Sequence, residues 1–344
     1  MIETNVMAYI AAPGKVTFDE QPIQDLGFKD VRIRVRAVAI CGSDLHIYKG
    51  KHPAAPLPVA IGHEIAGEVV EIGVEVKRVQ VGDRVAVEPV IICGHCHFCR
   101  RGVYHLCSNI SFQYRQGQGG FTRFFCAPED WVHKLPETLS YEEGALIEPL
   151  AVAVHAIKTA KLGLGEDCAI FGDGAIGLML LMLAQSYGAG DVFIVGIQEH
   201  RLQMARHLGA CMAVNNAVQD ALDQIHAHTG GLGVDKAFEA VGLENTLRQA
   251  LHSLKKGGTA VLIGLFEEPH ASLPVNLFVQ KEIVLKGSQG YNWDFQTAIK
   301  LVERGNIQLP PLITHVLSLE ELPRGFELLL DPTNKAIKVV VRID

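Results

Sequence analysis

The stretch Cys168-Ala-Ile-Phe-Gly172-Asp-Gly174-Ala-Ile-Gly177 decides the fold of the middle of this 344-residue chain. Its first four residues are typical of a short buried strand, and the apolar run from Ala175 to Tyr187 is typical of a helix. The glycines follow the pattern G-x-G-x-x-G. The first makes a tight turn, the second lets the backbone approach a pyrophosphate, and the third lets the helix pack on the strand. We therefore predict dinucleotide binding at Gly172, Gly174, Ala175, Ile176 and Gly177.

Strand and helix patterns alternate on both sides of this turn. Strands separated by helices favour a parallel sheet with helices on both faces, the doubly wound Rossmann arrangement. We expect this domain to cover residues 152–290. Its further elements are predicted as strands Asp191–Val195, Val234–Glu239, Thr259–Ile263 and Ile283–Gly287 and helices Arg201–Leu208 and Leu243–Leu254.

The end of the second predicted strand lacks a residue that NAD-binding domains usually carry. An acidic side chain normally lies there, about 20 residues past the glycines, and binds the ribose diol. This chain has Gly196, followed by Glu199 and Arg201. Gly196 puts nothing there to repel the 2′-phosphate of NADP, Arg201 offers a positive charge, and Glu199 offers a carboxylate further along. The sequence therefore leaves both NAD and NADP open.

The residues before and after this segment follow a different pattern. From Val31 to Ala39, apolar residues alternate with arginine, which is typical of a strand with one buried face. Ile65–Ile72 and Arg84–Val87 are further predicted strands. Ala336–Ile343 is also strand-like, and we expect it to rejoin the first domain, because an open sheet edge needs covering or pairing. These patterns predict a mainly antiparallel β domain from residues 1–151 and 291–344.

A lobe at about residues 90–110 holds four of the eight cysteines. Their short spacing lets four sulfurs surround one zinc ion in a tetrahedron. Because such a site has no open position, we predict a structural zinc. Disulfides are the alternative interpretation, and we expect the three histidines in this lobe to be solvated rather than to compete as ligands. The predicted ligands are Cys93, Cys96, Cys99 and Cys107.

A second set of metal-binding side chains lies between residues 41 and 64. It includes the thiol of Cys41, the imidazole of His63 and the carboxylate of Glu64. A catalytic zinc takes three such ligands and leaves a fourth position for water or substrate. The alternative is a buried structural cysteine beside an unrelated histidine.

Glu148 offers another carboxylate for the same metal. It precedes Pro149 and opens an apolar, helix-like run. It is therefore either placed at the metal or positioned to complement the positive end of a helix. We interpret His155, on the apolar face of this run, as a core residue.

Composition excludes several classes of function. The chain carries 38 acidic and 31 basic residues, a net charge of −7, which does not favour a nucleic-acid partner. The apolar run Ala175–Ala184 is shorter than the roughly 20 residues that span a bilayer. The first residues lack the basic and apolar regions of a signal peptide. We expect a cytoplasmic protein with a small-molecule substrate and no membrane or nucleic-acid partner.

Taken together, these segments resemble the zinc-dependent medium-chain dehydrogenases, in particular the polyol branch of sorbitol, xylitol and butanediol dehydrogenases. The resemblance runs almost from end to end. It implies a GroES-like catalytic domain joined to a Rossmann domain, two zinc ions per chain, and NAD or NADP as cofactor. It also implies oxidation of a secondary alcohol to a ketone by a homodimer or homotetramer.

The resemblance also implies roles for individual residues. Cys41 and His63 would hold the catalytic zinc, with Glu64 as third ligand and Glu148 able to replace it or to hold the metal-bound water. Ser43 and His46 would begin a proton relay.

Other interpretations differ in substrate or in class. Threonine dehydrogenases share much of the pattern but normally carry Asp-Pro-Phe-Gly where this chain has Glu148-Pro149-Leu150-Ala151, which favours the polyol branch. Gln289-Gly290-Tyr291 replaces the Arg-Tyr pair of animal sorbitol enzymes, so sorbitol itself is not implied. A zinc-free reductase would lack the Cys41–His63 pair. A non-catalytic nucleotide-binding protein that kept the fold is the alternative of another class.

Overall fold

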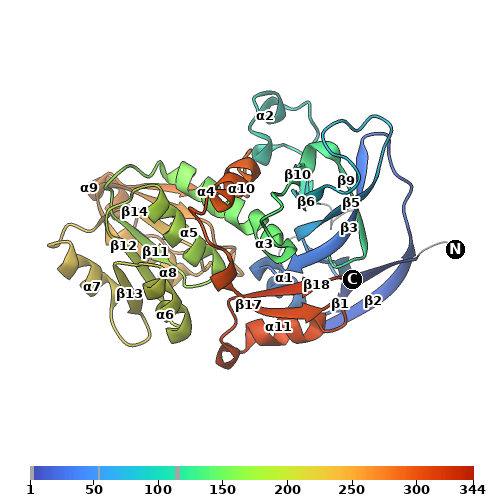
Figure 1. Cartoon of the computed structure of the whole chain (residues 1–344). Coiled ribbons are helices and arrows are strands. Elements are labelled where there is room, and N and C mark those ends of the chain that lie inside the picture. The colour runs from blue at the N-terminus through green and yellow to red at the C-terminus, as the bar shows by residue number, and fades with distance from the viewer. Residues whose placement is uncertain (1–3, 53–54, 113–116) are drawn as a thin grey trace. The chain divides into compact units, whose positions relative to one another are not determined.

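The computed structural model describes residues 4–52, 55–112 and 117–344 (Figure 1). The chain divides into two compact units. Unit 1 comprises Met1–Pro149 and Phe295–Asp344, and unit 2 comprises Leu150–Asp294. Among the residues described, no helix combines the length and the apolar character needed to cross a membrane.

Unit 2 is built on a six-stranded sheet in which every neighbouring pair of strands is parallel. The strand order is β13-β12-β11-β14-β15-β16, the order 3-2-1-4-5-6 of dinucleotide-binding sheets. The predicted doubly wound sheet is confirmed. The strands are β11 Cys168–Phe171, β12 Val192–Gly196, β13 Met212–Asn215, β14 Val234–Glu239, β15 Leu254–Leu262 and β16 Val284–Gly287.

Helices cover this sheet because their apolar residues pack on the strands. The interior of α5 is buried from Gly177 to Ala184 and packs on β11 and β12. α6 packs on β12 and β13, and α8 on β11, β14 and β15 (Figure 1). The helices are α5 Ala175–Ser186, α6 Glu199–His207, α7 Ala221–His228, α8 Glu244–Ser253 and α9 Val275–Lys281. β13, α7 and α9 were not predicted from the sequence.

Unit 1 contains a seven-stranded sheet of order β10-β6-β5-β3-β18-β17, with β9 also paired to β3. Its pairs are antiparallel except β17 with β18. Two smaller sheets, β2-β1-β4 and β7-β8, complete the unit. The predicted mainly antiparallel domain is confirmed. The strands are β1 Thr4–Ala12, β2 Lys15–Pro22, β3 Asp30–Ala39, β4 Val59–Ala60, β5 Glu64–Ile72, β6 Arg84–Val87, β7 Val90–Ile91, β8 Ser111–Phe112, β9 Phe124–Pro128, β10 Val132–Lys134, β17 Ile313–Ser318 and β18 Lys338–Arg342.

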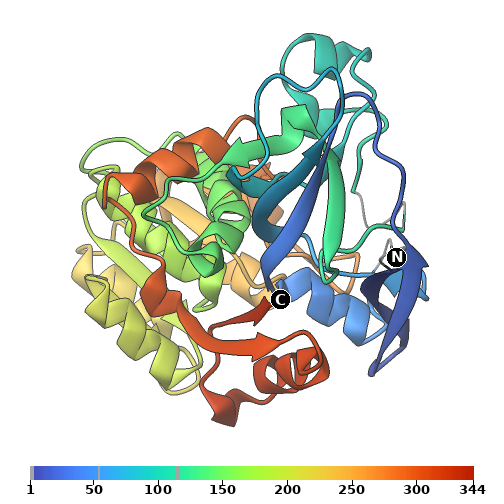
Figure 2. The same ribbon diagram turned by 45° about the vertical axis from the view of Figure 1, so that its right-hand side comes forward.

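The centre of the large sheet joins distant parts of the sequence. β3 pairs with β5 on one side, and β18 pairs with β3 antiparallel, with Val341 opposite Val38. Figure 2 shows the red C-terminal strands beside the blue N-terminal ones. Val31, Ile33 and Val35 are completely buried, as their alternation with arginine predicted.

Short helices connect these strands. The helices of unit 1 are α1 Gly42–Tyr48, α2 His97–Arg100, α3 Tyr141–Ala145, α10 Phe295–Glu303 and α11 Leu322–Leu330. α4, Ile147–Ala160, begins in unit 1 and continues into unit 2. The single turns of 3₁₀ helix are η1 Tyr104–Leu106, η3 Glu129–Trp131, η4 Pro310–Leu312 and η5 Pro332–Asn334.

Candidate functional site

Three of the predicted metal ligands meet at one end of the large sheet in unit 1. Cys41 directly precedes α1, while His63 precedes β5 and Glu64 is its first residue. One potential ligand atom from each lies within 4.8 Å of the other two. Sulfur, imidazole and carboxylate are the donors that a catalytic zinc takes, so the residues fit this ion. Glu148, in the first turn of α4, is buried but is not a member of this three-residue group.

A buried carboxylate supports two of these three residues. Asp44 Oδ2 accepts a hydrogen bond from the Cys41 backbone N–H at 3.0 Å, and Asp44 Oδ1 lies 3.6 Å from His63 Nδ1. Burial by itself lowers the pKa of His63, but Asp44 and Cys41 outweigh it and raise that pKa well above its usual value. Carboxylates that contact a ligating histidine fix its orientation. Sequence reasoning missed Asp44, although its position in the first turn after Cys41 was a usable signal.

A buried lysine contacts the third potential ligand. Lys338 Nζ donates to Glu64 Oε1 at 2.5 Å and to the Ile40 carbonyl at 2.9 Å. Burial acts to lower the pKa of Lys338, but Glu64, Cys41 and Glu148 outweigh it and raise that pKa. The lysine is therefore charged and offsets the acidic groups around it. Sequence reasoning missed this residue too, although a single lysine inside the apolar run Ala336–Ile343 was a signal.

The two predicted relay residues lie on α1. Ser43 and His46 are three positions apart, which places them on the same side of the helix, and both are half-buried. Because α1 begins directly after Cys41, this hydroxyl and imidazole follow the first potential metal ligand along one short helix.

The four cysteines of the lobe also converge. Each offers a sulfur within 4.8 Å of the others. Cys96 Sγ lies 3.5 Å from Cys99 Sγ, and Cys107 Sγ lies 3.6 Å from Cys93 Sγ. These distances are too long for disulfides. Four sulfurs arranged tetrahedrally at 2.3 Å from one zinc ion would be about 3.8 Å apart, which is close to the distances observed. All eight cysteines are free thiols, so the disulfide alternative is wrong.

The electrostatics of the lobe suit a cation. Backbone N–H groups of Cys99 and Ser108 lower the pKa of Cys96 to about 5, whereas burial and neighbouring thiols raise that of Cys99 to about 12. A zinc ion held by these four cysteines would remove this competition for protons, because it would bind all four sulfurs as thiolates. His95 Nδ1 lies 2.6 Å from the Cys93 carbonyl, and within the described part of the chain the group of close donors contains cysteines only.

A buried carboxylate ties the lobe to the large sheet. Glu88 follows β6 and accepts a short hydrogen bond from Tyr104, which lies between the third and fourth cysteines. Its other oxygen lies 3.0 Å from His133 Nε2 on β10. Glu88, Tyr104 and His133 are all buried. The position of the lobe therefore depends on a polar contact with the sheet as well as on its cysteines.

The glycine-rich turn in unit 2 has the geometry that its spacing predicts. Gly172 has a positive φ of 134°. A Cβ on Gly177 would lie 1.9 Å from the Gly172 carbonyl oxygen, so α5 packs on the turn only without a side chain there. A Cβ on Gly174, just before α5, would have no heavy atom within 4 Å. This open space at a helix N-terminus fits the pyrophosphate of a dinucleotide.

The end of β12 carries a negative charge, although the sequence indicated none at Gly196. The carboxylate of Asp173 fills the space beside Gly196, so this position does carry a negative charge. Arg201 Nη1 lies 3.9 Å from Asp173 Oδ1. Glu199 pairs instead with Arg206, at 2.8 Å. Sequence reasoning treated Asp173 only as a variable position of the glycine pattern.

A further group of close donors, which sequence reasoning missed, lies at the surface of unit 2. Asp191 Oδ2 lies 2.8 Å from His228 Nε2, and Cys211 Sγ lies 3.8 Å from the same nitrogen. Burial and the neighbouring Asp191 raise the pKa of Cys211 to about 11, so it is a protonated thiol. Cys211 and His228 are exposed, and the aspartate and histidine satisfy each other.

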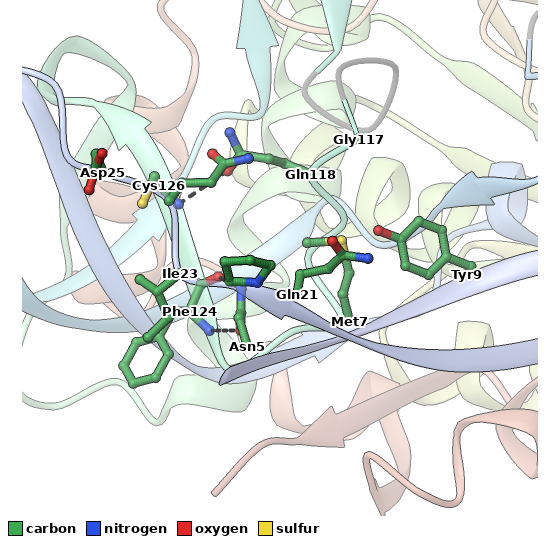
Figure 3. A pocket seen from close by; sticks show the side chains of 12 residues that line it. Asn5, Met7, Tyr9, Gln21, Ile23, Asp25, Gly117, Gln118, Phe124 and Cys126 are labelled. Carbon is green, nitrogen blue, oxygen red and sulfur yellow. Dashed lines mark hydrogen bonds between the residues drawn. The ribbon is translucent and has the colours of Figure 1, made fainter. Parts of the chain in front are cut away.

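A cavity of about 370 Å³ lies beside the β1–β2 hairpin of unit 1 (Figure 3). Its polar lining includes Tyr9, Gln21 and Gln118, and Asp25 is the one charged residue among the described residues that line it. Asn5, also at its wall, donates to the Phe124 carbonyl at 2.8 Å. The predicted metal ligands are not among its lining residues, so this cavity is separate from both sets of donors.

Two protein-family models match the chain. Residues 27–137 match the alcohol dehydrogenase GroES-like domain, and residues 175–304 match the zinc-binding dehydrogenase model. A sorbitol dehydrogenase of Bacillus subtilis is 36% identical over 95% of this chain and 94% of its own length. The (R,R)-butanediol dehydrogenase of the same species is 38% identical over 94% of each.

Solved structures agree with this match. The crystal structure of 2R,3R-butanediol dehydrogenase from Bacillus subtilis has a TM-score of 0.89 and 35% identity, covering 99% of this chain and 100% of the other. The chain therefore belongs to the zinc-dependent medium-chain alcohol dehydrogenases, in their polyol branch. It is an oxidoreductase that uses zinc and NAD or NADP, as its resemblance to this family predicted.

Proposed function

We propose that this enzyme transfers hydride between NAD(P) and a secondary alcohol of a polyol, diol or sugar-derived alcohol, giving a ketone. The observation that carries the proposal is the convergence of Cys41, His63 and Glu64 within 4.8 Å. In this proposal residues 1–151 and 291–344 form the catalytic domain, and residues 152–290 form the dinucleotide-binding domain. The relatives that support the substrate class are named for sorbitol and butanediol.

Each residue near the metal site has a proposed task. Cys41, His63 and Glu64 hold the zinc, and Asp44 orients His63. When bound, zinc supplies the Lewis acidity that lowers the pKa of an alcohol, and the nicotinamide accepts the hydride. Lys338 holds the Glu64 carboxylate and offsets part of the negative charge around it.

Ser43 and His46 are proposed to carry the proton away. The Ser43 hydroxyl accepts a hydrogen bond from the substrate hydroxyl and donates its own proton onward. His46, one helical turn later, passes the proton towards solvent, a task that suits imidazole because its ordinary pKa is near neutrality. Replacing Ser43 by alanine should therefore slow the proton-transfer step while the protein keeps its zinc.

We propose Glu64 rather than Glu148 as the third zinc ligand, because only Glu64 belongs to the close group of donors. Glu148, which is buried and raises the pKa of Lys338, then acts on the metal site through charge. Zinc content of E64Q and E148Q decides between them: the E64Q protein should lose its second zinc and E148Q should keep it. The reverse result would assign the ligand to Glu148.

A substrate panel tests the function itself. Sorbitol, xylitol, sugar acids, 2,3-butanediol and threonine should each be tried with NAD and with NADP, and we expect turnover with a polyol or diol. Turnover with threonine alone would favour threonine dehydrogenase. The matched variant is C41S, which should hold one zinc per chain and lose activity. Full activity of C41S with one zinc would contradict the assignment, and dinucleotide binding without turnover would favour the non-catalytic alternative.

The assembly and location are also proposals. We propose a cytoplasmic homodimer or homotetramer whose partner is a small-molecule alcohol. Light scattering coupled to gel filtration measures the mass in solution, and a monomeric mass at working enzyme concentration would refute this assembly.

A further inference from the structure

We propose that Asp173, inside the glycine-rich turn, makes this enzyme prefer NAD to NADP. It would supply the negative charge that other dinucleotide-binding domains place at the end of the second strand, where this chain has Gly196. This inference rests on the proposed function, because it concerns the cofactor of the same reaction.

The first observation is what Asp173 contacts. Its Oδ2 accepts hydrogen bonds from the backbone N–H groups of Ile197, at 2.9 Å, and Gln198, at 2.8 Å. These two N–H groups directly follow β12, at the carboxyl end of the strand where the ribose of a dinucleotide binds. Consecutive backbone N–H groups are a common anion-binding device. Here a carboxylate from the chain already uses them, so they are not available to a 2′-phosphate.

The second observation is that Asp173 and a side chain at position 196 exclude each other. A Cβ on Gly196 would lie 2.2 Å from Asp173 Oδ2, 2.3 Å from its Cγ and 2.4 Å from its Cβ. The clash reaches the Cβ of Asp173, so a change of its rotamer does not relieve it. Position 196 must therefore be glycine as long as Asp173 occupies this place. The carboxylate reaches the strand end from the first turn instead of from the strand itself.

The third observation concerns charge. Asp173 is buried, and its carboxylate would lie on the side of the turn where a 2′-phosphate adds two negative charges. Arg201 is a neighbouring cation, but its Nη1 lies 3.9 Å from Asp173 Oδ1, longer than a hydrogen bond. We infer that Arg201 compensates Asp173 only partly. The sequence alone suggested the opposite role for Arg201, as a partner of the phosphate.

Direct binding tests this preference without relying on turnover. The dissociation constants of NADH and NADPH should be measured by fluorescence on the zinc-loaded protein. We expect NADH to bind at least about tenfold more tightly, the scale of one like-charge contact near a protein surface. The central variant is D173N. Its amide oxygen still accepts from Ile197 and Gln198, so the loop keeps its shape while the charge is lost. In D173N the ratio of the NADPH to the NADH dissociation constant should fall by about tenfold.

Two further variants separate charge from shape. D173G/G196D moves the carboxylate to the strand and removes the Cβ clash. Its preference for NADH over NADPH should therefore be stronger than that of D173G. R201A should shift the preference further towards NADH, because Asp173 then lacks its partial counter-charge. The wild-type protein decides between this role and phosphate binding by Arg201: a wild-type protein that binds NADPH more tightly than NADH overturns the proposal.

The remaining outcomes are equally decisive. An unchanged NADH to NADPH ratio in D173N would show that the carboxylate does not discriminate. Failure of the wild-type protein to bind either dinucleotide would instead overturn the proposed function, and the two failures are distinguishable because only the second abolishes binding.

Discussion

Lys338 on β18 donates a hydrogen bond to Glu64 on β5 at 2.5 Å, and both side chains are buried. The two strands are not neighbours in the sheet, because β3 lies between them. The lysine also donates to the carbonyl of Ile40, which lies between β3 and Cys41. One ammonium group therefore connects the ends of three strands where the potential metal ligands meet.

The first prediction concerns this pair. K338M should destabilise the protein by about 3–5 kcal/mol, because it leaves the buried Glu64 charge without its partner. The double variant E64Q/K338M should recover part of that loss, since neither member then remains as an unpaired buried charge. Chemical denaturation measures both. Equal stability of K338M and the wild type would contradict a charged pair.

The second prediction separates the two metal sites. C93S should reduce zinc from two ions to one per chain, and the zinc at Cys41, His63 and Glu64 should remain. It should also lower thermal stability, because a four-cysteine zinc contributes directly to folding. The matched control is C126S. Cys126 lies on β9 outside the close donor groups, and burial raises the pKa of its thiol. Elemental analysis should find two zinc ions in C126S, and loss of zinc there would refute the assignment of ligands.

The third prediction tests the glycine-rich turn. G177A should unfold or loosen unit 2, because its Cβ would lie 1.9 Å from the Gly172 oxygen. G174A should fold normally, since that position faces open space, but should bind NADH more weakly because a methyl group enters the space proposed for the pyrophosphate. Circular dichroism and fluorescence titration measure the two effects. Tight NADH binding by G174A would place the pyrophosphate elsewhere.

The fourth prediction is a pH dependence of stability. Asp294 is fully buried and contacts His155 Nδ1 at 2.9 Å and Lys158 Nζ at 2.5 Å. Burial acts to raise the pKa of Asp294, but hydrogen bonds from His155, Asn292 and Lys158 outweigh it and lower that pKa. The stabilisation from this carboxylate is thus complete above its unfolded pKa of about 3.9 and is lost as the pH falls through its lower folded pKa.

D294N measures that contribution. It should be less stable than the wild type by about 1–3 kcal/mol at neutral pH, and the difference should shrink as the pH falls below about 4. Thermal unfolding at a series of pH values tests this. A difference that grows towards low pH would have the wrong sign and would exclude an ionised Asp294.

Local sequence pattern predicted most of the fold. The limits of β6, β11 and β14 agree with the structure, and most residues of each of these short strands are buried. β13 was missed because its residues are mostly half-buried and show no period. α9 is seven residues long and has no fully buried residue, although Leu277 and Phe278 pack against the core of unit 2. Fewer than two full turns of helix are too short to show a clear helical period.

The site was harder to predict where it depends on pairs of distant residues. The residue types between positions 41 and 64 and the resemblance to zinc dehydrogenases pointed to Cys41, His63 and Glu64, and their role as zinc ligands stays a prediction. Lys338 lies 274 positions from Glu64, so no local pattern relates them. The role proposed for Asp173 depends on its contact with Gly196. The sequence does not show this contact, because it joins the glycine-rich turn to the end of β12.

Unit 1 is made from both ends of the chain, with unit 2 inserted between them. During synthesis, Cys41, His63 and Glu64 leave the ribosome early, whereas Lys338 arrives only after the whole of residues 150–294 has been translated. Until then Glu64 has no ammonium partner, and the central strand β3 has an unpaired edge where β18 will add. The ion pair between Lys338 and Glu64, and the full pairing of β3, therefore form only after β18 has been translated.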